Sequence, residues 1–191
     1  MRMDTVQEEL TKIVNGVDVR KLQATIEAIN RDPDLAVFSF HATNEWVDGA
    51  QTKTIVDSME GGPHTIRHRE PFVLRSDEPE VLLGADTAPN SIVNLLHSLA
   101  SCLSTTIVYH AAAREIPIDR MTISLDGDID LHGFLGLSSE VRPGFQDIRV
   151  TVDLQSEAPR ADVEELLRYA QKVSPIVDTL RNRIPVEIAL K

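Results

Sequence analysis

The feature that most constrains the fold is a long, apolar helical stretch in the middle of the chain, residues 90–110. On a helical wheel, apolar residues, among them Leu95, Leu96, Leu99 and Leu103, lie around most of this stretch. A helix with apolar residues nearly all round is buried on every side. Because one modest sheet covers only one side, we expect the same helix of a partner subunit to cover the other. The stretch therefore predicts a homodimer with this helix at its centre.

Charge and composition argue against several functional classes. The formal net charge of −11 argues against binding nucleic acid or an anionic membrane surface, since such proteins rely on clustered Lys and Arg. Asn94, His97 and several hydroxyl residues interrupt the apolar stretch, so we expect no membrane span. One cysteine cannot close an intrachain disulfide, and the first residues lack the apolar core of a signal peptide. We therefore expect a cytoplasmic protein, and 191 residues suit one main domain.

The periodicity of apolar residues predicts the order of helices and strands. The predicted elements are two short helices within 4–32, strands at 35–46, 51–56 and 64–75, a long helix from 89 or 90, strands at 123–131 and 148–154, helices at 161–172 and 174–181, and a strand at 185–190. Strands that are grouped apart from helices indicate an α+β fold rather than alternating βαβ units. We assign residues 1–33 to an N-terminal helical extension and residues 34–191 to the main domain.

Cys102 is the only cysteine and lies in the middle of the long helix. A thiol there is either a catalytic sulfur inside a buried site or a small core hydrophobe. Thiols become useful nucleophiles beside a cation, a metal or a helix N-terminus, but Cys102 lies about twelve residues into the helix, where the helix dipole has faded. No Arg, Lys or His lies one helical turn away. Any activation must therefore come across space, from a strand or from the partner chain.

The remaining candidate motifs indicate neither a metal nor a cofactor. His64 and His68 have the spacing of a helical metal pair, but in an extended strand they are roughly 13 Å apart. The alternating aspartates of residues 126–130 resemble the opening of a calcium loop, yet its twelfth position is Leu137. Gly133–Gly136 is too short for a nucleotide-binding loop. We therefore predict no metal site and no bound cofactor.

An ordered series of short motifs runs through the main domain and carries a family resemblance. The motifs are Asp77-Glu-Pro, Leu83-Gly-Ala-Asp86, Ala88-Pro-Asn90, Leu99-Ala-Ser-Cys102, Gly127-Asp-Ile-Asp130, Gly133-Phe-Leu-Gly136, Pro143-Gly-Phe145 and Ser174-Pro175. This series, within residues 37–190, resembles the family of osmotically inducible proteins and organic hydroperoxide resistance proteins (OsmC/Ohr). The resemblance implies an intertwined α+β homodimer, with long central helices packed against antiparallel sheets and an active site at each subunit junction.

The resemblance also implies a redox chemistry and a catalytic residue. Family peroxidases reduce organic hydroperoxides with two cysteines; the first becomes a sulfenic acid and the second condenses with it to a disulfide that a dithiol reopens. The first cysteine falls on Cys102, which we predict to be catalytic. The second falls on Ser174. Because serine cannot form a disulfide, the usual recycling step cannot occur within one chain.

Two further family residues, an arginine and a glutamate that stabilise the thiolate, have no counterpart at the expected places. The glutamate falls near Val93 and the arginine near Trp46; Arg67 or Arg69 of the third strand could approach the sulfur instead. Two hypotheses follow. The chain is a thiol-dependent hydroperoxide reductase that uses one cysteine and an external thiol reductant. Alternatively, it is a non-catalytic member of the family that binds a small apolar ligand in the pocket at the dimer interface.

Overall fold

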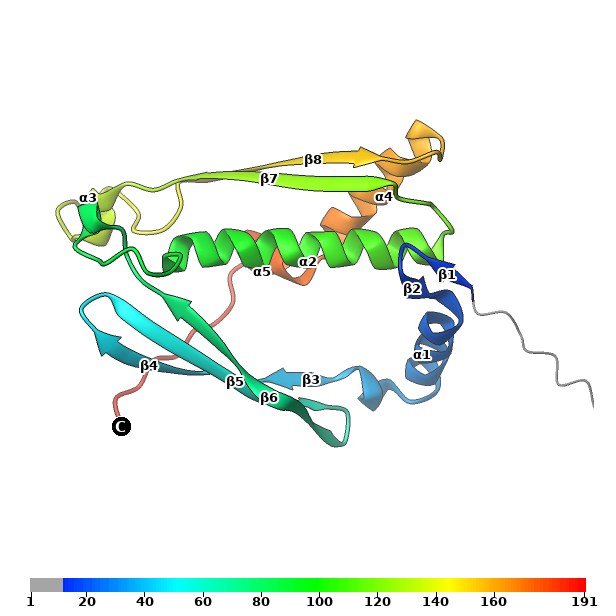
Figure 1. Cartoon of the computed structure of the whole chain (residues 1–191), viewed down its shortest axis with the longest axis horizontal. Coiled ribbons are helices and arrows are strands. Elements are labelled where there is room, and N and C mark those ends of the chain that lie inside the picture. Colours follow the sequence, from blue (N-terminus) through cyan, green and yellow to red (C-terminus); the bar gives the residue numbers. More distant parts are fainter. Residues whose placement is uncertain (1–11) are drawn as a thin grey trace, which may run out of the picture.

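The computed structural model describes residues 12–191 and shows an α+β fold, as predicted (Figure 1). Residues 4–11 of the first predicted helix lie outside the described residues. The elements are β1 (Ile13–Val14), β2 (Val17–Asp18), α1 (Val19–Arg31), β3 (Phe38–Phe40), β4 (Thr43–Asp48), β5 (Gln51–Gly61), β6 (His64–Ser76), α2 (Ser91–Ala113), β7 (Arg120–Asp128), α3 (Leu131–Phe134), β8 (Asp147–Gln155), α4 (Arg160–Val173) and α5 (Pro175–Arg181).

Strands β3 to β6 form one antiparallel sheet with β5 at its centre. β6 pairs with one edge of β5, and β3 and β4 pair in succession with the other edge. The strand predicted over residues 35–46 is therefore confirmed, but it is divided into two strands, β3 and β4. Gly49 and Gly62 lie in the hairpin turns, with φ of 51° and 55°. Glycine adopts this left-handed conformation without steric cost, which is why both turns could be predicted.

β7 and β8 form a second antiparallel sheet, with Arg120 opposite Gln155 and Asp128 opposite Asp147. The strand predicted over 123–131 ends earlier, at Asp128. Leu131 instead begins α3, because the side chain of Asp130 caps this helix by accepting a hydrogen bond from the His132 N–H.

The core lies where α2 packs against β7, α4 and α5 (Figure 1). Its buried members are Leu99, Leu103, Ile107, Ala111, Ile116, Leu166, Ala170 and Val177. Burying a large aliphatic side chain stabilises a fold by about 2 kcal/mol. This core therefore fixes the position of α2, which carries Cys102.

Only one face of α2 is covered in the single chain. Another face is exposed to solvent. It consists of residues spaced four apart along the helix, which we call the exposed stripe: His97, Ser101, Thr105 and Tyr109. Within the described residues, α2 is the one helix that is long and apolar enough to cross a membrane, judged by length and composition only. Core helices of soluble proteins meet the same criterion, and α2 contributes the buried core described above.

The first of the two helices predicted within residues 4–32 is wrong for the residues that the structure describes. Ile13–Val14 pairs with Val17–Asp18 in a small hairpin, because Asn15 and Gly16 form its turn with positive φ of 52° and 79°. The Asn15 side chain anchors this hairpin to the chain after α2. Its amide donates to the Ile116 carbonyl at 2.9 Å. The second predicted helix is confirmed as α1.

The predicted strand at 185–190 is also wrong for the single chain. These residues are extended but form no ladder with any described strand, and in Figure 1 the tail runs from α5 past β4. Val186, Ile188 and Leu190 are 74%, 94% and 102% exposed. A strand needs a partner edge for its backbone hydrogen bonds. The alternating pattern is present, but no strand edge within residues 12–191 pairs with it.

Candidate functional site

The structure brings Cys102 and Ser174 together. The Cys102 Sγ lies 3.3 Å from the Ser174 Oγ, within hydrogen-bonding distance, although 72 residues separate them. Ser174 is fully buried and Cys102 is partly buried. The family resemblance assigns both redox positions to these residues, and they are in contact in the folded chain.

The local backbone holds Ser174 rigidly. Ser174 ends α4 and precedes α5, so its N–H donates to the Ala170 carbonyl at 2.9 Å and its carbonyl accepts from the Asp178 N–H at 3.0 Å. Pro175 occupies the first position of α5, where its fixed φ favours a helix and its missing N–H costs nothing. The hydroxyl of Ser174 is therefore presented at a defined place beside α2.

A buried carboxylate organises the loop that leads into α2. Asp77, 1% exposed, accepts hydrogen bonds from the Thr87 hydroxyl at 2.7 Å, the Thr87 N–H at 3.1 Å and the Glu78 N–H at 2.8 Å. These bonds, the Thr87 hydroxyl first, hold the pKa of Asp77 well below its ordinary value. Asn90 then caps α2 by accepting from the Val93 N–H. This clamp sets where α2 begins and was not predicted.

The sulfur has neutral surroundings in the single chain. Among residues 12–191, Ser174 is the one side chain that hydrogen-bonds to the Cys102 sulfur. Arg67 and Arg69 are exposed on β6, and neither hydrogen-bonds to Cys102. Trp46 stands where the resemblance places the family arginine. Its indole N–H donates to the Gly49 carbonyl at 3.0 Å, so this side chain is engaged in its own hairpin turn. Within residues 12–191, no cationic side chain therefore hydrogen-bonds to the sulfur.

The histidines of α2 face other groups. The His97 ring lies 3.5 Å from the Ser101 hydroxyl. His110 contacts the Tyr169 ring edge-on at 4.8 Å, and Arg114 lies over that ring at 4.7 Å. Burial, with Arg114 adding to it, lowers the pKa of His110 and so favours its neutral form. The Cys102 site thus has a hydroxyl partner and no imidazole from its own chain. Within the described residues, no group of three or more acidic, His or Cys side chains could hold a metal.

Comparison with known proteins decides the family. The sequence profile of the OsmC-like protein family matches residues 84–189, more than half of the chain. The chain belongs to the OsmC family. The matched segment includes both Cys102 and Ser174 as well as the core around α2. No curated protein sequence matches the chain.

Solved structures of OsmC-like proteins share the fold. The OsmC-like protein of Mycoplasma pneumoniae is 16% identical, with a TM-score of 0.57 over 75% of this chain and 87% of that one. A protein of Psychrobacter arcticus named for osmotic stress and detoxification is 15% identical, with a TM-score of 0.54 over 72% and 85%. An OsmC-like protein of Vibrio cholerae is 11% identical, with a TM-score of 0.55 over 74% and 92%. At such identities the likeness concerns the fold.

Proposed function

We propose that this OsmC-family protein is a hydroperoxide reductase that uses a single cysteine, Cys102, with an external thiol as reductant. The observation that carries the proposal is the contact of the Cys102 sulfur with the hydroxyl of buried Ser174. The two residues that the family resemblance assigns to a two-cysteine site lie in contact, but the second holds oxygen in place of sulfur. Ser174 supplies a hydrogen bond in place of a disulfide partner.

The reaction proceeds in three balanced steps. The Cys102 thiolate attacks the outer oxygen of the hydroperoxide; an S–O bond forms, the O–O bond breaks, and the alkoxide leaves with a proton as the alcohol. An external thiol then attacks the sulfenic sulfur, and the departing hydroxide takes a proton to leave as water. A second external thiol attacks the mixed disulfide and regenerates Cys102. The Ser174 hydroxyl can donate a hydrogen bond to the thiolate and to the sulfenic oxygen without being consumed.

The proposed assembly is a homodimer. In the single chain, large apolar side chains of the β3–β6 sheet are exposed: Phe40 by 76%, Trp46 by 72% and Leu74 by 59%. The tail after α5 is equally uncovered. The middle of the exposed stripe of α2 consists of two small hydroxyl residues, Ser101 and Thr105, that let two helices approach closely. Exposed apolar surface of this extent marks a protein interface. A partner would also bring side chains from a second chain near each Cys102, including a cation, which the described residues of one chain do not hydrogen-bond to the sulfur.

The tail provides a direct test of the dimer. We expect the wild-type protein to sediment as a dimer at micromolar concentration and Ile188→Asp to weaken association by about tenfold or more, because a large apolar side chain would lose its burial. Ala189→Asp is the matched control, since alternate residues of an extended segment point to opposite sides. A monomeric wild-type protein, or equal effects of both variants, would refute the proposed assembly.

A non-catalytic role remains the second candidate, and one observation favours it. No charged side chain of the described residues hydrogen-bonds to the Cys102 sulfur, so these residues supply no charged partner that would activate the thiol. In that case the pocket at the proposed subunit junction would bind a small apolar ligand. The net charge of −11 supports a small-molecule partner in either case, rather than nucleic acid or an anionic membrane, and we place the protein in the cytoplasm.

One experiment distinguishes the two functions. Reduced protein is mixed with cumene hydroperoxide, and Cys102 is assayed by intact mass after dimedone labelling and by turnover with dithiothreitol. For a reductase we expect Cys102 to be oxidised about a hundredfold faster than free cysteine, the low end of what positioned groups contribute. The Cys102→Ala variant should show neither adduct nor turnover. Oxidation at the rate of free cysteine, without turnover, would leave only the non-catalytic role.

A further inference from the structure

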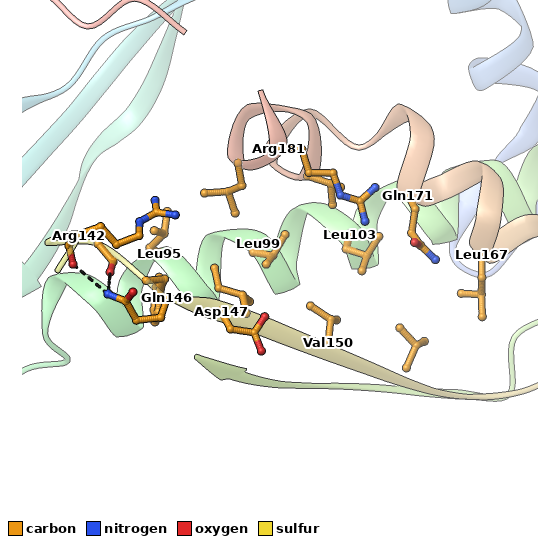
Figure 2. Close-up of a pocket in the computed structure, with 16 residues that line it drawn as sticks. Leu95, Leu99, Leu103, Arg142, Gln146, Asp147, Val150, Leu167, Gln171 and Arg181 are labelled. Carbon is orange, nitrogen blue, oxygen red and sulfur yellow. Dashed lines mark hydrogen bonds between the residues drawn. The ribbon is translucent and has the colours of Figure 1, made fainter. Parts of the chain in front are cut away.

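A groove of about 630 Å³ runs along the flank of α2 that faces β8 and α5 (Figure 2). Its floor consists of apolar side chains from α2, β8 and α5: Leu95, Leu99, Leu103, Val150, Val152, Val177 and Leu180. Neither Cys102 nor Ser174 lines it. A volume of this size is typical of small-molecule sites, which hold between about 300 and 1,000 Å³.

The groove carries two cationic groups that no side chain of the described residues neutralises. The side chains of Arg142 and Arg181 both line it, and neither forms a hydrogen bond or ion pair with a described residue. In Figure 2 the Arg181 guanidinium lies between Leu103 and Gln171, and that of Arg142 lies near Leu95. Two free guanidinium groups over one apolar floor are notable in a chain of net charge −11.

The one carboxylate of the groove lining already forms an ion pair with another residue. Asp147 pairs with Arg149 at 2.7 Å, and Arg149 also pairs with Asp128. The polar amides Gln146 and Gln171 complete the rim. The net charge offered to a bound molecule is therefore positive.

We propose that this groove binds an amphipathic anion with a single aliphatic chain, such as a free fatty carboxylate. The chain would lie on the leucine and valine floor, and the head group would accept charge-assisted hydrogen bonds from Arg181 or Arg142. Guanidinium groups match planar carboxylates in a bidentate geometry. The apolar floor and the charged rim together favour this ligand class. A neutral hydrocarbon would leave both arginines without an anionic partner, and a small anion would leave the apolar floor exposed to water.

On α2, the groove lies on the side away from the exposed stripe of the proposed dimer contact. Leu99 of the floor is two positions from both His97 and Ser101 of the exposed stripe, and Leu103 is two positions from Ser101. Residues two apart on a helix point to nearly opposite sides. The proposal therefore concerns a site separate from both the thiol and the subunit junction, and it does not depend on peroxidase activity.

The test is calorimetric titration of the full chain with dodecanoate below its micellar concentration. We expect saturable binding at one site per chain, retained in Cys102→Ala, and weakened about fivefold by Arg181→Gln or Arg142→Gln as exposed charge-assisted hydrogen bonds are lost. Dodecanol should bind more weakly to the wild-type protein and equally to both variants. Arg183→Gln is the matched control because it removes the same charge outside the groove lining.

Three outcomes would overturn the proposal. The first is absence of dodecanoate binding to a folded wild-type protein. The second is an equal loss of affinity in Arg183→Gln, which would indicate general attraction by charge. The third is that Arg181→Gln alters dimer dissociation while dodecanoate does not bind, in which case a second copy of the chain covers the groove. Circular dichroism of each variant distinguishes loss of binding from loss of the fold.

Discussion

We expect Ser174→Cys to close a disulfide with Cys102 as soon as the protein meets one equivalent of hydroperoxide. The present Sγ to Oγ distance is 3.3 Å, and the longer C–S bond of cysteine brings the two sulfurs closer to the bonding distance of about 2.05 Å. Water leaves as the new thiol attacks the Cys102 sulfenic acid. Both thiols should disappear from an alkylation count, and the intact mass should fall by two hydrogens.

This disulfide should also stabilise the fold. Because 72 residues separate the two positions, loss of chain entropy in the unfolded state predicts a gain of about 4 kcal/mol over the reduced variant. Thermal unfolding of the oxidised and reduced protein measures it directly. Ser124→Cys, an exposed position on β7, is the control that adds a thiol without a nearby sulfur. If oxidised Ser174→Cys kept two free thiols or accumulated sulfenic acid like the wild type, the preserved two-position site would be disproved.

The sequence predicted those parts of the fold that depend on local chemistry. Asp48-Gly49 and Gly61-Gly62 mark hairpin turns because glycine tolerates the backbone conformation that such turns require. The long helix begins at its predicted start because Asn90 is a good N-cap. Asn15-Gly16 carries an equally local signal for a hairpin, and the helical spacing of nearby apolar residues hid it.

Long-range features could not be predicted from residues alone. The contact of Cys102 with Ser174 depends on how α4 and α5 pack on α2, and only the family resemblance indicated it. Asp77 belongs to one of the motifs that carry the family resemblance, but the motif does not indicate its hydrogen-bond partners. Two of these, Thr87 and Ala85, lie in an irregular turn, where no helix or strand periodicity predicts which groups meet. The strand expected at 185–190 fails for a related reason, since a strand is completed by another segment's edge rather than by its own sequence.

The largest loss of stability is expected from Gly84→Ala, in the loop between β6 and α2. A Cβ at this position would lie 1.8 Å from the Glu78 carbonyl oxygen and 2.3 Å from its carbon. These are backbone atoms, so no side-chain rotation relieves the overlap. The Glu78 carbonyl accepts from the Asp86 N–H at 3.1 Å, and the Glu78 N–H donates to Asp77. Displacing Glu78 therefore disrupts the clamp that fixes the start of α2.

We expect Gly84→Ala to cost about 3 kcal/mol, the upper part of the range for overpacking, which lowers the melting temperature by roughly 6–12 °C in a chain of this size. Gly136→Ala is the matched control. Its φ is 69°, but no atom lies within 4 Å of an added Cβ, so it isolates the backbone cost of about 1 kcal/mol. Both proteins are melted at the same concentration, since a dimer's stability depends on it. Equal shifts would mean that the loop yields freely and that the Asp77 clamp does not determine where α2, and with it Cys102, is held.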